Sequence, residues 1–85
     1  MILGIDPANV ESAYVVVEND LSAVVDKGKI FNPELQRKIS NWKAENYPID
    51  YVAIEGIQSF GMPVGQTTFE TCYFIGRLLE QFEAF

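Results

Sequence analysis

The sequence predicts one α/β domain in which three strands, a helix, a fourth strand and a second helix follow one another. Short apolar runs rich in β-branched residues open the chain, and two segments with apolar residues at helical spacing come later, separated by one further apolar run. A chain of 85 residues, 48% of them hydrophobic, is long enough to bury one core. We therefore expect a single domain over residues 1–85 with the order β-β-β-α-β-α.

The first three expected strands cover residues 2–6, 13–17 and 22–30 and form an antiparallel meander. Residues 2–6 have apolar residues at both odd and even positions, which is typical of a strand covered on both faces. Asn19 and Asp20 predict a tight turn between the second and third strands. Residues 26–28 predict a bulge or an early bend in the third strand.

Helix signals follow the meander. Asn32 is a suitable N-cap and Pro33 a suitable first helical residue. We expect this helix to end near Asn46, ahead of Pro48. Its apolar stripe, expected in the core, contains Leu35, Ile39 and Trp42.

A second helix is expected to start at a capping box formed by Thr67 and Glu70. Gly76 would allow it to approach the sheet closely. The helical-period positions expected to continue along it are Phe69, Cys72, Tyr73, Gly76, Leu79 and Glu80, and its apolar face is expected to continue to Phe82.

The fourth strand, Val52–Glu55, is a short apolar run that ends on a carboxylate and has the character of a buried strand. A helical crossover is right-handed and joins parallel strands, which places this strand parallel to residues 2–6. Asp6 and Glu55 are then both at carboxyl ends of parallel strands, so they should emerge side by side.

Two adjacent carboxylates repel each other unless a cation lies between them or one takes up a proton. The chain has no His and a single cysteine, Cys72, so the cation expected is a hard one, Mg²⁺ or Mn²⁺. Such a site can hold the ions used in phosphodiester hydrolysis. The alternative is purely structural: Asp6 caps the turn before Pro7, and Glu55 is an exposed acid at a strand end.

The charge balance limits the partners. The chain has 6 basic and 12 acidic residues and a net charge of −6, which argues against a free-standing nucleic-acid binder unless carboxylates hold metal or basic surface lies outside the chain. The one cysteine, the lack of a signal-peptide pattern and the short apolar runs lead us to expect a cytoplasmic protein.

Several segments together resemble a RuvC-type Holliday junction resolvase, with the closer likeness to the phage and mobile-element branch of that family. The likeness spans nearly the whole chain. It is carried by residues 2–7 (ILGIDP), 14–17 (YVVV), 52–55 (VAIE), the loop 59–65 (SFGMPVG) and the helix residues 68–72 (TFETC) and 75–77 (IGR).

The resemblance implies a ribonuclease H-like fold that cleaves branched DNA in recombination, using Mg²⁺ or Mn²⁺ held by Asp6 and Glu55 as catalytic residues. The family's last strand and helix, with its remaining acids, have no match here, and Glu80 and Glu83 do not correspond to them. We therefore expect an incomplete domain that is inactive or weak alone. The open edge at Val52–Glu55, or the last helix, would then favour self-association, as a homodimer.

Candidate DNA contacts are Ser59, Phe60 and Gln66. Phe60 could stack on bases or, equally, fold back over the core. The basic side chains of Arg37, Lys38, Lys43 and Arg77 could contact DNA backbone or simply be solvated.

Two other readings of the chain stay open. One is a non-catalytic, self-associating module with a nuclease-derived fold. The other is a fragment of an actin-like nucleotide-binding fold, which needs a glycine-rich phosphate turn at residues 7–12; that segment has no glycine.

Overall fold

The computed structural model of the protein describes residues 1–56 and 65–83. The expected element order β-β-β-α-β-α is confirmed there. The elements are β1 (Ile2–Asp6), β2 (Glu11–Val17), β3 (Val24–Phe31), α1 (Asn32–Ala44), β4 (Tyr51–Ile54) and α2 (Gln66–Glu83). No helix among these residues is long and apolar enough to cross a membrane.

The four strands form one mixed sheet in the order β3-β2-β1-β4. β1 pairs antiparallel with β2, and β2 antiparallel with β3, so the meander is confirmed. β1 pairs parallel with β4, as the helical crossover predicted. The central strand β1 therefore lies beside β4, and their carboxyl ends point in the same direction.

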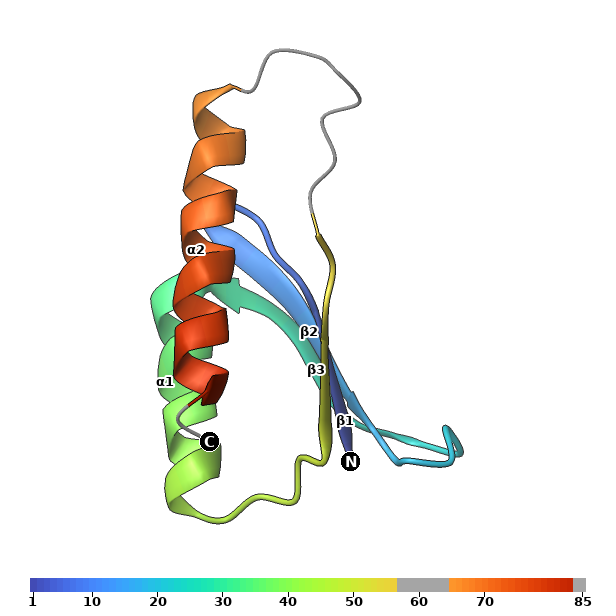
Figure 1. The fold of residues 1–85 in the computed structure, drawn as a ribbon. Coiled ribbons are helices and arrows are strands. Elements are labelled where there is room, and N and C mark those ends of the chain that lie inside the picture. Colours follow the sequence, from blue (N-terminus) through green and yellow to red (C-terminus); the bar gives the residue numbers. More distant parts are fainter. Residues whose placement is uncertain (57–64, 84–85) are drawn as a thin grey trace.

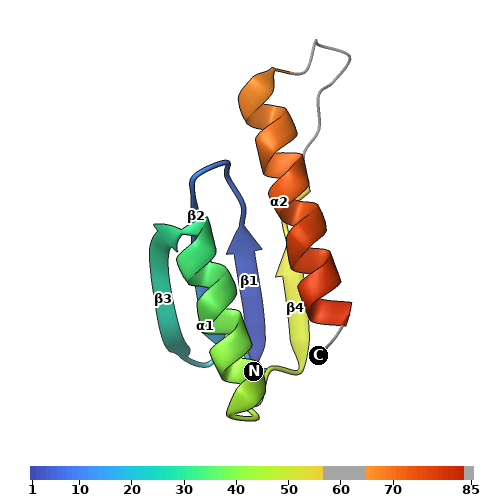
Figure 2. The same ribbon diagram turned by 90° about the vertical axis from the view of Figure 1, so that its left-hand side faces the viewer.

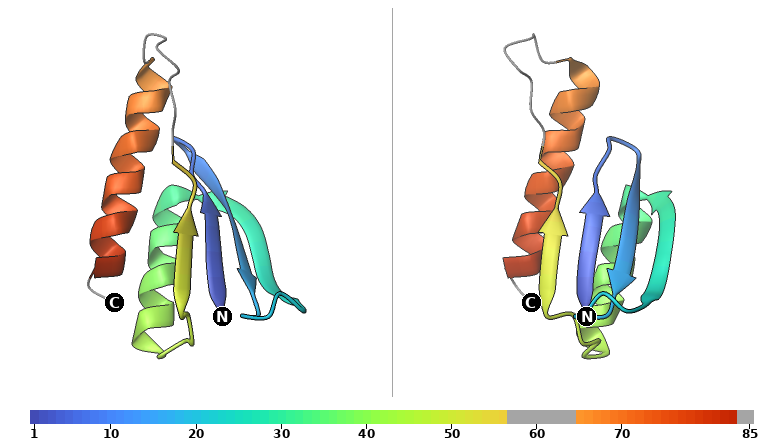
Figure 3. Two further views of the ribbon diagram at one scale, coloured as in Figure 1. Left: turned by 45° about the vertical axis from the view of Figure 1, so that its right-hand side comes forward. Right: turned by 90° about the vertical axis from the view of Figure 1, so that its right-hand side faces the viewer.

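Both helices lie on the same side of the sheet, giving two layers (Figure 1). Seen from the other side, no described helix covers the sheet (Figure 3). Only alternate residues of β1, Leu3 and Ile5, are buried, so the expectation of a strand covered on both faces is wrong for the part of the chain that the structure describes. β4 is an edge strand whose first three residues are exposed. The prediction of a buried strand at Val52–Glu55 is thus wrong, whereas that of an open edge is confirmed among these residues.

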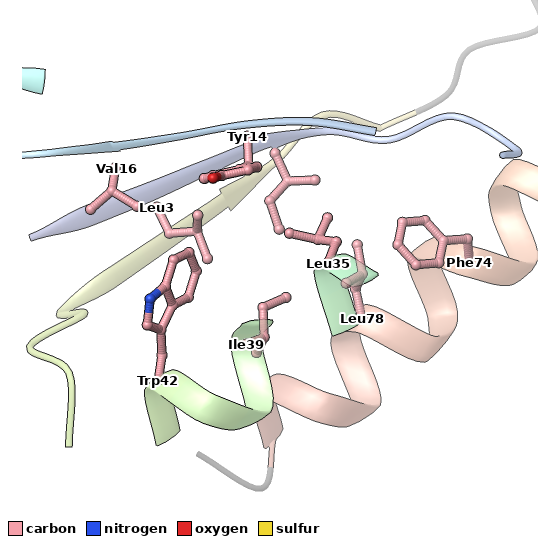
Figure 4. Close-up of a cluster of buried hydrophobic side chains, with 9 residues drawn as sticks. Leu3, Tyr14, Val16, Leu35, Ile39, Trp42, Phe74 and Leu78 are labelled. Atoms are coloured by element: carbon pink, nitrogen blue, oxygen red, sulfur yellow. The ribbon is translucent and has the colours of Figure 1, made fainter. Parts of the chain in front are cut away.

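The core lies between the sheet and the two helices (Figure 4). Trp42 is buried as expected; its ring meets Tyr14 edge-on at 6.1 Å between ring centroids and stacks on Tyr47 at 5.3 Å. The buried hydrophobic residues are Leu3, Ile5, Tyr14, Val16, Leu35, Ile39, Trp42, Phe74 and Leu78. The predicted stripe of the first helix is therefore confirmed in full.

α1 begins one residue earlier than predicted. Phe31 occupies the N-cap position without a side-chain cap, and Asn32, predicted as the cap, is the first helical residue and is buried. The helix ends at Ala44, and Asn46 adopts a left-handed conformation with φ of 54°, which is a common way to terminate a helix.

α2 buries a different face from the one predicted. Thr71, Phe74 and Leu78 are buried, whereas Phe69, Tyr73 and Leu79 are exposed. Apolar residues occupy both sides of this helix, so periodicity could not choose between them. A Cβ at Gly76 would meet nothing within 4 Å, so this glycine serves no close approach to the sheet among the described residues. Of the predicted apolar face, only Phe82 packs partly on the core.

Two local predictions in the meander also need correction. The irregularity in β3 lies at Val25, since Val16 pairs with Asp26 and Val17 with Val24. The turn between β2 and β3 extends past Asn19 and Asp20 to Leu21, which has a φ of 64° and donates its N–H to the carbonyl of Glu18 at 2.9 Å. In this longer turn Leu21, and not a glycine, takes the left-handed backbone conformation.

Candidate metal centre

Asp6 and Glu55 lie at the adjacent carboxyl ends of β1 and β4. The parallel register pairs Ile5 with Ile54, and the Glu55 N–H donates to the Ile5 carbonyl at 3.1 Å. This bond extends the strand pairing by one residue and fixes the backbone of Glu55 beside that of Asp6. The predicted juxtaposition of the acids is therefore present in the structure.

The two carboxyl groups act directly on each other. A side-chain hydrogen bond to Asp6 and the negative charge of Asp6 raise the pKa of Glu55 above its ordinary value. Both residues are exposed, so water and ions can reach them. A raised pKa means that the doubly ionised pair is disfavoured until a positive charge joins it.

No basic side chain supplies that charge within the described residues. The ion pairs there join Met1 to Asp50 and Lys38 to Asp26. Two carboxylates without His or Cys fit a hard, oxygen-binding cation such as Mg²⁺ or Mn²⁺, which keeps several water ligands. Residues 1–56 and 65–83 contain no group of three or more potential ligands. The pair could thus supply part of a coordination shell, with water completing it.

A buried polar cluster supports the loop that follows Asp6. The Ser12 hydroxyl donates to Asn32 Oδ1 at 2.6 Å and accepts the Ala8 N–H at 3.0 Å. Asn32 Nδ2 donates to the Ala8 carbonyl at 2.8 Å. Sequence reasoning missed this role, because Asn32 also has the residue type of an N-cap. The sequence did hold one sign of it: Ser12 is a polar residue at a position of β2 whose side chain faces the core.

A second set of bonds ties the same loop to α2. Glu70 accepts from Gln66 Nε2 at 3.0 Å and from Asn9 Nδ2 at 3.2 Å, and these two bonds lower the pKa of Glu70. The predicted capping box is therefore wrong: Thr67 lies inside the helix, where its carbonyl accepts the Thr71 hydroxyl at 2.8 Å. Glu70 links two elements instead of capping one.

The structure places only some of the residues predicted to contact DNA. Ser59 and Phe60 lie outside the described residues. Gln66 is the first residue of α2 and is exposed, with its amide bound to Glu70. Of the basic residues, Lys38 is bound to Asp26 at 3.2 Å and lies over the rings of Tyr14 and Trp42, so its role is structural.

An apolar hollow lies on the uncovered face of the sheet and reaches the acid pair. Its lining on β1, β2 and β4 includes the small residues Gly4, Ala13 and Ala53, and Asp6 and Glu55 belong to the same hollow. The acid pair therefore lies at the rim of an open apolar surface.

Comparison of the chain with protein-family models, with curated proteins and with solved structures gives no match. What can be said of the centre therefore depends on its own geometry and chemistry.

Proposed function

We propose that the chain is part of a metal-dependent, structure-specific DNA endonuclease of the RuvC type, built on a ribonuclease H-like fold. The observation that carries this proposal is the carboxylate pair, Asp6 and Glu55, on adjacent parallel strands. The partner would be branched DNA. The acids would hold Mg²⁺ or Mn²⁺, and the resemblance in sequence supplies the choice of substrate.

The residues present fit such an ion, since two exposed oxygen donors lie together with no basic partner in the described chain. When bound, a divalent cation there supplies charge stabilisation for phosphodiester hydrolysis. The chain's own contribution is to hold both carboxylates at fixed strand ends. The cluster of Ser12 and Asn32 supports this by fixing the loop that follows Asp6.

The test is cleavage of a labelled four-way DNA junction in Mn²⁺. We expect slow cleavage, because two carboxylates provide only part of the ion's shell. Asp6→Asn and Glu55→Gln should each abolish it, and Glu45→Gln, which removes the same charge at the far end of α1, should not. Cleavage that persists in Asp6→Asn or Glu55→Gln, or that is lost equally in Glu45→Gln, would contradict the proposal.

A second candidate is self-association through β4, and the two edges of the sheet favour it. β3 carries Lys27 and Lys29 along its edge, whereas β4 exposes Tyr51 (65%) and Val52 (38%) without a charge. Uncharged edges invite pairing with another strand, and charged ones resist it. We propose a homodimer joined at β4, whether or not the chain cleaves DNA.

Light scattering of matched variants tests the dimer. Val52→Lys should shift the chain to monomer, and Val24→Lys, on the opposite edge strand, should leave the dimer intact. A monomer at high protein concentration in the unaltered chain would rule this candidate out.

A further inference from the structure

A cleft separates the two helices near the ends of α1 and α2 that lie toward the loop after β1. Nearer the C-terminus of α2 the helices are joined, because Gln81 Nε2 donates to the Gln36 carbonyl at 2.7 Å and to Ser40 Oγ at 3.1 Å. Beyond this contact the cleft has a volume of about 650 Å³ and is bounded by Asn9 and Phe31. Figure 2 shows the two helices side by side in front of the sheet. Pockets for small ligands have volumes of roughly 300–1,000 Å³, so this one is large enough to be a binding site.

The chain has two arginines, and both line this cleft: Arg37 from α1 and Arg77 from α2. Neither forms an ion pair within the described residues. The Arg77 guanidinium lies over Tyr73, 5.4 Å from the ring centroid. Guanidinium groups bind phosphate through paired hydrogen bonds, and two of them at one cleft favour an anionic ligand.

Neither described carboxylate of the cleft forms an ion pair with these arginines. Glu70 is bound by the side-chain amides of Asn9 and Gln66. Glu34 lies in the first turn of α1, where the positive end of the helix dipole favours its charge. The arginines therefore remain available to a ligand.

Aromatic rings line the same cleft. Tyr73 is 69% exposed and Phe31 53% exposed, whereas Phe74 is buried in the core and also lines the cleft. Exposed rings beside arginines form the combination that binds single-stranded nucleic acid: bases stack on the rings, and the cations bind the backbone. A purely apolar partner would leave Arg37 without an acceptor among the described residues and Arg77 with only the Tyr73 hydroxyl, to which it donates at 3.5 Å.

We propose that the cleft between α1 and α2 binds a nucleotide unit of single-stranded DNA, with its base against Tyr73 or Phe31 and its phosphate at Arg37 and Arg77. The choice of DNA rests on the proposed nuclease function. The net charge of −6 argued against nucleic-acid binding without metal, but both arginines of the chain line this one cleft. The binding itself needs neither Asp6 nor a metal ion, so the two proposals can fail separately.

The experiment is fluorescence anisotropy of a labelled oligothymidylate with the whole chain, in EDTA at low salt. We expect binding, and we expect Tyr73→Ala to weaken it about 5- to 150-fold, the range found for removal of one base-stacking ring. Arg37→Gln and Arg77→Gln should also weaken it. The controls are Leu21→Ala, an exposed apolar side chain in the turn between β2 and β3, and Lys29→Gln, an exposed cation on β3; both should leave affinity unchanged. Thermal unfolding of each variant checks that the fold is retained.

Three outcomes would overturn the proposal. The first is absence of binding in EDTA. The second is an equal loss of affinity in Lys29→Gln and Arg37→Gln. The third is displacement of the oligonucleotide by an acidic helical peptide at a lower concentration than by unlabelled oligothymidylate. The last would assign the cleft to a protein partner. If Asp6→Asn abolishes junction cleavage but binding in EDTA is absent, the nuclease proposal stands and this one fails.

Discussion

Removal of the Ser12 hydroxyl should destabilise the whole domain and loosen the loop beside the acid pair. Ser12 is 1% exposed, and its hydroxyl takes part in two of the three side-chain hydrogen bonds that connect β2, the loop at Ala8 and the start of α1. Alanine at this position leaves Asn32 Oδ1 without its donor in a buried setting. It also leaves the Ala8 N–H without its acceptor.

The size of the effect follows from these two lost bonds. A buried polar group left without a partner costs about 1–3 kcal/mol. For Ser12→Ala we expect a loss of about 2 kcal/mol, which in a domain of this size lowers the Tm by roughly 8–16 °C. The affinity for Mn²⁺ should fall as well, because the loop after Asp6 is less well fixed.

Urea denaturation followed by circular dichroism measures the change. Ser22→Ala, which removes an exposed hydroxyl, is the control and should change the free energy of unfolding by less than about 0.5 kcal/mol. In a double-mutant cycle with Asn32→Ala, we expect a coupling energy of about 1 kcal/mol. A Ser12→Ala variant as stable as the unaltered chain would refute the assignment of this cluster as a structural support.

Three further predictions concern Gly28, Asp26 and Glu55. A Cβ at Gly28 would lie 3.0 Å from Tyr14 Cε1, so Gly28→Ala should reduce stability by about 1–3 kcal/mol in urea denaturation. Burial raises the pKa of Asp26, but hydrogen bonds from Lys38 and Tyr14 outweigh it and lower that pKa. The resulting stability is present above the ordinary carboxyl range and is lost as pH falls through the lowered pKa. Asp26→Asn should therefore weaken the dependence of the free energy of unfolding on pH in the acid range. The pKa of Glu55, raised by Asp6, should return toward its ordinary value in Asp6→Asn when followed by carbon-13 NMR. Since a raised pKa gives stability that is lost as pH rises through it, the same variant should be the more stable one at neutral pH without added cation.

The sequence was sufficient to predict the element order and the acid pair. The apolar runs and helical spacing are local signals, and the right-handed crossover then determines that β4 lies parallel to β1. Once that pairing is known, Asp6 and Glu55 must lie at the same end of the sheet. The prediction of the acid pair needed no information on tertiary contacts beyond the strand topology.

The sequence could not predict which face of α2 is buried or what Asn32 does. α2 has aromatic residues on both sides, and the choice between Phe74 and Tyr73 depends on where the helix lies against α1. Asn32 has the residue type of an N-cap, but its place next to Ser12 is a tertiary contact between residues 20 positions apart. The cleft with its two arginines was also hidden, because it forms only when the two helices pack together.

The central claim is that Asp6 and Glu55 together hold a divalent cation. Paramagnetic broadening of backbone amide signals during a Mn²⁺ titration tests it most directly. We expect the signals at the carboxyl ends of β1 and β4 to broaden first, and this early broadening to be lost in Asp6→Asn and retained in Glu45→Gln. Broadening that begins at other acidic residues, such as Glu18 and Asp20, or that is unchanged in Asp6→Asn, would contradict the claim.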